Sequence, residues 1–110
     1  MPLVDAGRLN QRVTILVKTV VRGDMGGHDE TWAPLTNGVV WAEIVDMSGR
    51  EIYNARAMGS EATKRITIRW RTDVKADQRV QFSDGTQARV EWIREVRPRL
   101  WIEMFCLDVN

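Results

Sequence analysis

K-R-I-T-I-R-W-R, the stretch from Lys64 to Arg71, gives the clearest structural signal in this chain. Its apolar residues Ile66, Ile68 and Trp70 recur at every second position, which is the period of a β-strand with one buried face. The residues on the other face are polar: Arg65, Thr67, Arg69 and Arg71. The alternation therefore predicts a half-buried strand whose outer face carries arginines.

Runs of similar character before and after this strand predict a mainly β protein. They span Arg12 to Thr19, Trp32 to Leu35, Val39 to Val45, Arg79 to Phe82, Gln87 to Val96 and Leu100 to Leu107. The polar, glycine-rich segment from Arg22 to Glu30 predicts a hairpin loop, and Asn37-Gly38 and Ser83-Asp84-Gly85 predict turns. Because the last run is apolar on nearly both faces, we expect it to form a central strand.

One short helix interrupts the strands. Ser48-Gly49-Arg50-Glu51 is a capping-box pattern, in which the side chains of Ser48 and Glu51 each accept from the backbone N–H of the other. Gly59 offers a stop, so the predicted helix has about ten residues. The whole pattern predicts one domain, residues 1–110, folded as a small antiparallel β-barrel of about six strands with this helix between the third and fourth strands.

Length and composition also fit one globular domain. The chain has 110 residues, of which 44% are hydrophobic and 28% are charged, so it is too apolar for a disordered protein. A formal net charge of +1 provides no strong attraction to nucleic acid or to an anionic membrane. The apolar runs fall far short of the roughly 20 residues that span a bilayer, and the N-terminus lacks a signal-peptide pattern. We therefore expect no contact with a membrane.

The residues that carry most catalytic and metal chemistry are scarce. A single cysteine, Cys106, excludes an internal disulfide, and a single histidine, His28, excludes the usual zinc sites. We expect His28 to be a solvated loop residue and Cys106 to be a small buried hydrophobe. The sequence thus predicts no catalytic, cofactor-binding or metal site. An enzyme with Cys106 as its nucleophile is an alternative, and it predicts a thiol that reacts quickly in the folded protein.

Tryptophans and arginines each allow two interpretations. The five tryptophans, which we expect in the core, could instead form a platform on which single-stranded nucleic acid stacks. They are Trp32, Trp41, Trp70, Trp92 and Trp101. Arg65, Arg69 and Arg71 form either a solvated outer face or a contact with acidic residues of a neighbouring subunit.

A series of short motifs runs through nearly the whole chain. In order they are A-G-R-L-N-Q-R-V-T-I (Ala6 to Ile15), D-M-G-G (Asp24 to Gly27), E-T-W (Glu30 to Trp32), V-W-A-E-I (Val40 to Ile44), S-G-R-E (Ser48 to Glu51) with the helix Tyr53 to Ala57, I-T-I-R-W-R (Ile66 to Arg71), R-V-Q-F (Arg79 to Phe82) and F-C-L (Phe105 to Leu107). With these motifs the chain resembles the phage head-tail joining family, also called head closure or head-tail connector proteins, of tailed phages and prophages.

The resemblance implies a structural role in a virion and no enzymatic activity. It implies a homo-oligomeric ring at the virion neck, which closes the DNA-filled head and offers the surface on which the tail docks. The implied neighbours are a portal or adaptor ring on the head side and a tail-terminator or tail protein on the other. DNA would pass through the channel without sequence-specific binding. Assembly would take place in the host cytoplasm, with the portal as a template, so the isolated chain can be monomeric.

By the same resemblance, the segment from Met47 to Lys64 contributes to subunit contacts and to closing the channel. The residues expected there are Met47, Ser48, Gly49, Arg50, Glu51, Ile52, Tyr53, Arg56 and Met58. The short predicted helix fits this role, because a helix of this length needs a partner to be stable. Two other functions stay open: a small nucleic-acid-binding barrel, whose binding would weaken steeply with salt, and a tail-terminator or minor tail protein.

Overall fold

Six strands form the body of the described protein. The computed structural model describes residues 6–22, 28–96 and 100–109. Within these ranges the elements are a 3-10 helix η1 (Ala6–Arg8), β1 (Gln11–Arg22), β2 (His28–Asp46), α1 (Gly49–Ala57), β3 (Lys64–Arg69), β4 (Arg79–Phe82), β5 (Gln87–Val96) and β6 (Trp101–Val109). The four strands predicted from Lys64 onward are therefore confirmed.

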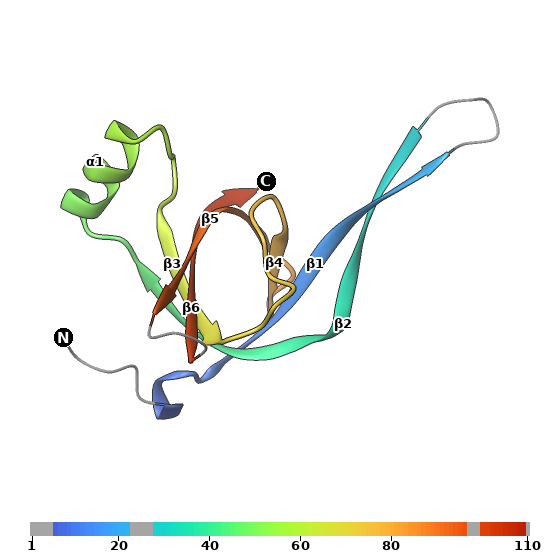
Figure 1. Ribbon diagram of the computed structural model, residues 1–110, viewed down its shortest axis with the longest axis horizontal. Coiled ribbons are helices and arrows are strands. Elements are labelled where there is room, and N and C mark those ends of the chain that lie inside the picture. The colour runs from blue at the N-terminus through green and yellow to red at the C-terminus, as the bar shows by residue number, and fades with distance from the viewer. Residues whose placement is uncertain (1–5, 23–27, 97–99, 110) are drawn as a thin grey trace.

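The strands close into one barrel in the order β1-β2-β3-β6-β5-β4, and all neighbouring strands are antiparallel. Closure pairs strands that would otherwise expose free edges. In Figure 1 the barrel occupies the centre, α1 stands to one side, and the far end of the β1–β2 hairpin extends away on the other. The predicted antiparallel β-barrel with one short helix is confirmed. Among the described residues, no helix is long and apolar enough to cross a membrane.

Apolar side chains from all six strands fill the barrel. The buried residues of this cluster are Val13, Ile15, Ala42, Ile66, Ile68, Val74, Val80, Ala88, Val90, Ile102, Met104 and Cys106. Ile66 and Ile68 are fully buried, as the alternation predicts for β3. Thr67 between them, which was predicted to lie on the outer face, is buried as well, so burial does not alternate at the centre of the strand. β6 lies between β3 and β5 and is buried continuously from Ile102 to Cys106, so its predicted central position is also confirmed.

The region before α1 differs from the prediction in one respect. The segments Trp32–Leu35 and Val39–Val45 belong to one strand, β2, and are not two strands joined by a turn. The helix consequently lies between the second and third strands of the barrel.

A bulge explains this difference. Thr14 pairs with Val39 and Leu16 pairs with Pro34, so residues 35–38 of β2 bulge opposite the single residue between Thr14 and Leu16. Asn37 has a φ of 53° within the bulge. The Asn-Gly pair therefore bends β2 without reversing the chain, as bulges do at barrel rims.

Beyond the bulge, β1 and β2 continue as a two-stranded arm, which Figure 1 shows projecting from the barrel. Their pairing continues as far as Arg22 and His28. The predicted loop is therefore shorter than the segment from Arg22 to Glu30, and His28 begins β2 instead of lying in a loop. Residues 23–27, which the loop prediction also covers, and the side chain of His28 lie outside the described part of the chain.

The tryptophans do not form the core, which corrects the expectation from the sequence. None of the five is buried; Trp70 and Trp92 pack against the edges of buried clusters. The other three lie beneath arginines, with the guanidinium carbon to ring-centroid distance given for each: Arg79 over Trp32 (4.2 Å), Arg12 over Trp41 (4.6 Å) and Arg69 over Trp101 (5.5 Å). A six-stranded barrel is narrow, so its interior suits side chains smaller than indole.

Candidate functional site

The helix α1 begins with the capping box that the sequence predicts. Ser48 Oγ accepts from the backbone N–H of Glu51 at 3.2 Å, and Glu51 Oε1 accepts from the backbone N–H of Ser48 at 3.2 Å. After the last turn, Gly59 adopts a φ of 86° and its N–H bonds to the carbonyl oxygen of Arg56. These bonds satisfy backbone groups at both ends of the helix, so its length follows from the local sequence.

A small apolar cluster, separate from the barrel interior, attaches α1 to the outside of the barrel. Its buried residues are Met47, Ala55, Ala62 and Phe105, with Ile52 and Trp92 packed against them. The rings of Trp92 and Phe105 are stacked with their centroids 3.8 Å apart. Ala55 is the buried residue of α1, so the helix leaves most of its own surface uncovered.

The structure divides the nine residues predicted in this segment into two groups. Met47 is buried and Glu51 and Ile52 are half-buried, so these three hold the helix in place. The exposed residues are Ser48, Gly49, Arg50, Tyr53, Arg56 and Met58. Tyr53 and Met58 are 74% and 83% exposed, unusually high for large apolar side chains. Large apolar side chains with this much exposure are available for contact with another molecule.

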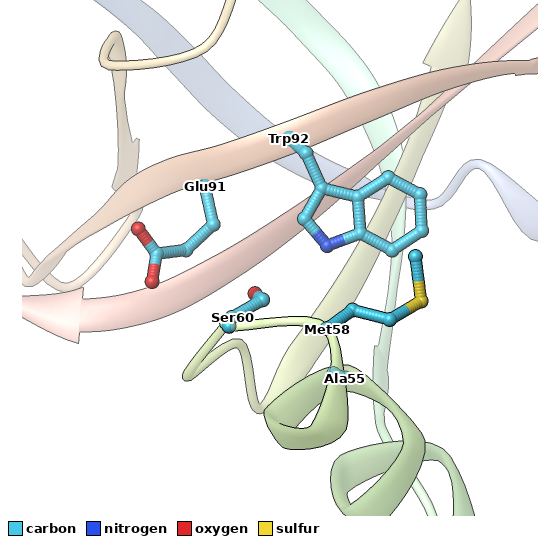
Figure 2. Close-up of a pocket in the computed structure, with 6 residues that line it drawn as sticks. Ala55, Met58, Ser60, Glu91 and Trp92 are labelled. Atoms are coloured by element: carbon cyan, nitrogen blue, oxygen red, sulfur yellow. The ribbon is translucent and has the colours of Figure 1, made fainter.

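A hollow of about 400 Å³, the α1 hollow, lies between the C-terminal end of α1 and β5. It is lined by Ala55, Met58, Gly59, Ser60, Glu91 and Trp92. In Figure 2 the Met58 thioether and the Trp92 indole face each other across it, and Glu91 lies beside the Trp92 end. The hollow can accept an apolar side chain, and it places one carboxylate at its edge.

Arg65, predicted to be available for contacts with another subunit, forms ion pairs within its own chain. Arg65 Nη1 lies 3.2 Å from Glu51 Oε2, and Arg65 Nε lies 3.5 Å from Glu103 Oε2. Arg94 donates to the other carboxylate oxygen of Glu103. Glu103 is nearly buried, so its charge needs these partners. The network links the capping box of α1 to β3, β5 and β6.

Arg71 is also used within the chain. Its guanidinium donates to Asp73 through Nε (2.9 Å) and Nη2 (2.8 Å), and to the carbonyl oxygens of Thr36 and Asn37. The Arg71 hydrogen bond lowers the pKa of Asp73 below its ordinary value. Arg71 thus fastens the β2 bulge to the segment after β3. Of the three predicted arginines, Arg69 is the exposed one, and in the described part of the chain no carboxylate pairs with it.

Arg69 belongs to an ordered row of side chains that the sequence did not reveal. Arg12 of β1 pairs in register with Trp41 of β2, and Arg69 of β3 pairs with Trp101 of β6. The β2–β3 register, continued by two residues from the pair of Glu43 and Thr67, places Trp41 opposite Arg69. Arg12, Trp41, Arg69 and Trp101 therefore alternate across four adjacent strands, and we call this set the Arg–Trp row.

The burial of the Cys106 thiol argues against a role as a nucleophile. Cys106 is fully buried in the barrel, and burial raises its pKa to about 12. At about pH 8 the thiol therefore stays protonated in the folded protein. We expect Cys106 not to react with a chromogenic disulfide reagent while the protein is folded. After denaturant unfolds the chain, one thiol per chain should react. A rapid reaction without denaturant would contradict this expectation and revive the enzymatic alternative.

The family model and the curated relative indicate the same family. The family model described as phage head completion protein matches residues 4–109. The chain is 35% identical over 83 residues to head completion protein gp7 of Enterobacteria phage HK97, covering 74% of this chain and 71% of that protein. Its fold is similar to the solution structure of protein SF1141 from Shigella flexneri 2a, with a TM-score of 0.78, 27% identity and 96% of each chain covered.

A second structural likeness extends to a virus-like particle. A chain in the virion of the native gene transfer agent particle superimposes with a TM-score of 0.60 at 19% identity, covering 91% of this chain and 94% of that one. At this identity the likeness concerns the fold.

Proposed function

Because this chain belongs to the phage head completion protein family, we propose that identical copies of it form a ring at the virion neck. The family is structural and non-enzymatic, and its members are components of phage-like virions. In our proposal the ring closes the DNA-filled head and presents the docking surface for the tail. It adjoins a portal or adaptor ring on one side and a tail-terminator or tail protein on the other, and it assembles in the host cytoplasm.

The observation that carries this proposal is the helix standing outside a closed barrel. The barrel completes its own hydrogen bonding, whereas α1 has one buried residue and exposes Tyr53 and Met58. A nine-residue helix gains most of its stability from packing, so a second packing surface would stabilise it. The segment from Met47 to Lys64 is accordingly the part of each copy that we assign to subunit contacts and channel closure.

Charge supports the same assignment. Arg65 and Arg71 neutralise carboxylates of their own chain, so Arg69 is the arginine that we assign to contacts between copies. The formal net charge of the whole chain is +1. A strongly basic channel would bind phosphates tightly, so a nearly neutral subunit suits DNA that passes without sequence-specific binding.

Electron microscopy of particles tests the proposed function. Without this protein we expect filled heads that leak DNA and carry no tails, because the neck is left open. The double variant Tyr53→Ser/Met58→Ser should reproduce this loss, since it removes the two exposed apolar side chains of α1. Lys75→Ser, which alters an exposed residue between β3 and β4, is the matched control and should restore tailed particles.

Two other outcomes of that experiment are informative. Normally tailed particles in the absence of the protein would reject the proposed function. Heads that keep their DNA but carry defective tails would favour the tail-terminator or minor tail protein alternative. Purified double variant should show the same far-ultraviolet circular dichroism as the unmodified chain, which separates loss of contact from loss of folding.

A further inference from the structure

Exposed large apolar side chains lie on β2 and at α1, and a fifth, Leu100, immediately precedes Trp101 of β6. Val39 and Trp41, 54% and 51% exposed, lie on β2, whereas Tyr53 and Met58 lie at α1. β3 connects the two regions, since it follows the α1 segment and ends at Arg69 in the Arg–Trp row. At about 3.3 Å per residue, the six residues of β3 separate the two surfaces by roughly 17 Å. One chain therefore carries two different apolar surfaces.

The Arg–Trp row combines an exposed aromatic ring with two arginines that have no carboxylate partner in the described residues. Trp41 lines two hollows, of about 420 Å³ and about 250 Å³, and Arg69 lines both. Arg12 stacks on Trp41, and neither Arg12 nor Arg69 pairs with a carboxylate in the described ranges. Tryptophan and arginine at the centre of a patch are the residues that most often dominate the binding energy of protein interfaces.

The α1 hollow is complementary to the Arg–Trp row in shape and charge. Its lining is mainly apolar, and Glu91 lies at its edge. Glu91 Oε1 accepts from the backbone N–H of Glu61 at 3.4 Å, and Glu61 lines the neighbouring hollow with Arg56, Gly59 and Ser60. Glu91 also pairs with Arg89 at 3.0 Å, whereas Glu61 is exposed and forms no ion pair within the described residues. This edge can therefore receive arginine side chains from another molecule.

We propose that Trp41 of one copy inserts into the α1 hollow of a second copy, with Arg12 and Arg69 meeting Glu61 and Glu91. This inference rests on the proposed function, because it names the surface that the α1 segment meets in the ring. The donor and acceptor surfaces differ, so the contact is head to tail and leaves each copy with one free surface for the next. Such a contact closes into a ring when the rotation between copies divides a full turn.

The Arg–Trp row suits a nucleic-acid partner less well than a protein partner. A stacking platform presents open aromatic faces, but Arg12 covers one face of Trp41 and Arg69 lies over Trp101. A groove that follows a phosphate backbone also needs several free cations, whereas this row has two. Exposed Val39 and Trp41 add apolar area, which a protein partner would bury.

Cross-linking between two differently tagged chains tests the contact. One chain carries Val39→Cys, two residues before Trp41 on the same face of β2, and the other carries Arg56→Cys, in the last turn of α1 next to the α1 hollow. Trp41 and Met58 are therefore kept, and Cys106 remains because its thiol is buried. Mixed at about 1 mM, which captures even weak association, the pair is treated with a short bismaleimide. We expect several-fold more product between the two different chains than from a control mixture of Val39→Cys with Lys75→Cys chains. Matching thermal unfolding of all three variants shows that each is folded.

Charge exchange provides a second readout. Arg69→Glu in the Val39→Cys chain should reduce the product to the level of the control, and Glu61→Lys in the Arg56→Cys chain should restore part of it. A yield no higher than the control mixture, or a predominance of products joining two Val39→Cys chains, would overturn the head-to-tail contact. Salt-sensitive binding of a single-stranded oligonucleotide that is lost in Trp41→Ser would also overturn it.

These outcomes are independent of the test of the proposed function. If cross-linking fails while Tyr53→Ser/Met58→Ser still abolishes tailed particles, the contact with Trp41 is wrong and the role of α1 in the neck stands. If particles without the protein are normally tailed, the ring itself is rejected whatever the cross-linking shows.

Discussion

Replacement of Ile66 by alanine is expected to lower the free energy of unfolding by about 3 kcal/mol, within a range of about 2–5 kcal/mol. Ile66 is fully buried at the centre of β3, where it pairs with Ile44 of β2 and Met104 of β6. Neighbouring side chains come from strands fixed by hydrogen bonds on both sides, so they cannot collapse into the space. Urea unfolding followed by tryptophan fluorescence measures the loss.

Two matched variants provide reference values for this loss of stability. Ile66→Val removes one methylene and should cost about 0.5–1.5 kcal/mol. Val39→Ala, at a position that is 54% exposed, should cost at most about 0.5 kcal/mol. An Ile66→Ala variant no less stable than Val39→Ala would mean that Ile66 does not pack in the barrel interior.

The sequence predicted most reliably those elements whose signals are local. β3 and β6 are specified by which faces of the strand are apolar, and a covered strand shows this without knowledge of its neighbours. The start of α1 is equally local, because Ser48 and Glu51 are three residues apart and satisfy each other. These features agree with the structure because no distant residue is needed to decide them.

Strand partners decide the features that the sequence did not predict. Asn37-Gly38 favours a turn, yet pairing of β2 with β1 on both sides of this dipeptide turns it into a bulge. Trp41 and Trp101 follow an apolar alternation, yet their neighbours in register, Arg12 and Arg69, cover them from outside. Such outcomes depend on register, which links residues far apart in the sequence.

In the candidate site, too, local features were predicted from the sequence and features that depend on tertiary contacts were not. The α1 segment was predicted from the capping box and the resemblance, and the structure adds which of its residues are exposed. The roles of the arginines depend on tertiary contacts: Arg65 pairs with Glu51 and Glu103, while Arg69 has no carboxylate partner in the described residues. An arginine on an alternating strand therefore does not reveal whether it serves its own chain or another.

Replacement of Gly38 by alanine is the second substitution with a large expected effect, a loss of about 1–3 kcal/mol in the free energy of unfolding. A Cβ atom at this position would lie 2.8 Å from the carbonyl oxygen of Leu35 and 3.0 Å from that of Ile15. Both are backbone atoms, so neither can move aside without distorting the bulge. Because Val39 and Trp41 follow directly on β2, we also expect less cross-linking through Val39→Cys.

Gly49→Ala separates the effect of space from the general effect of replacing glycine. A Cβ atom at Gly49 would have nothing within 4 Å, and Gly49 is the first residue of α1. Alanine there should stabilise the protein by about 0.4–1 kcal/mol, because it restricts the unfolded chain without strain in the folded one. Thermal and urea unfolding of both variants measure the difference. If Gly38→Ala were as stable as Gly49→Ala, the close approach of β1 to the β2 bulge would be wrong, and with it the reason that Asn37-Gly38 does not form a turn.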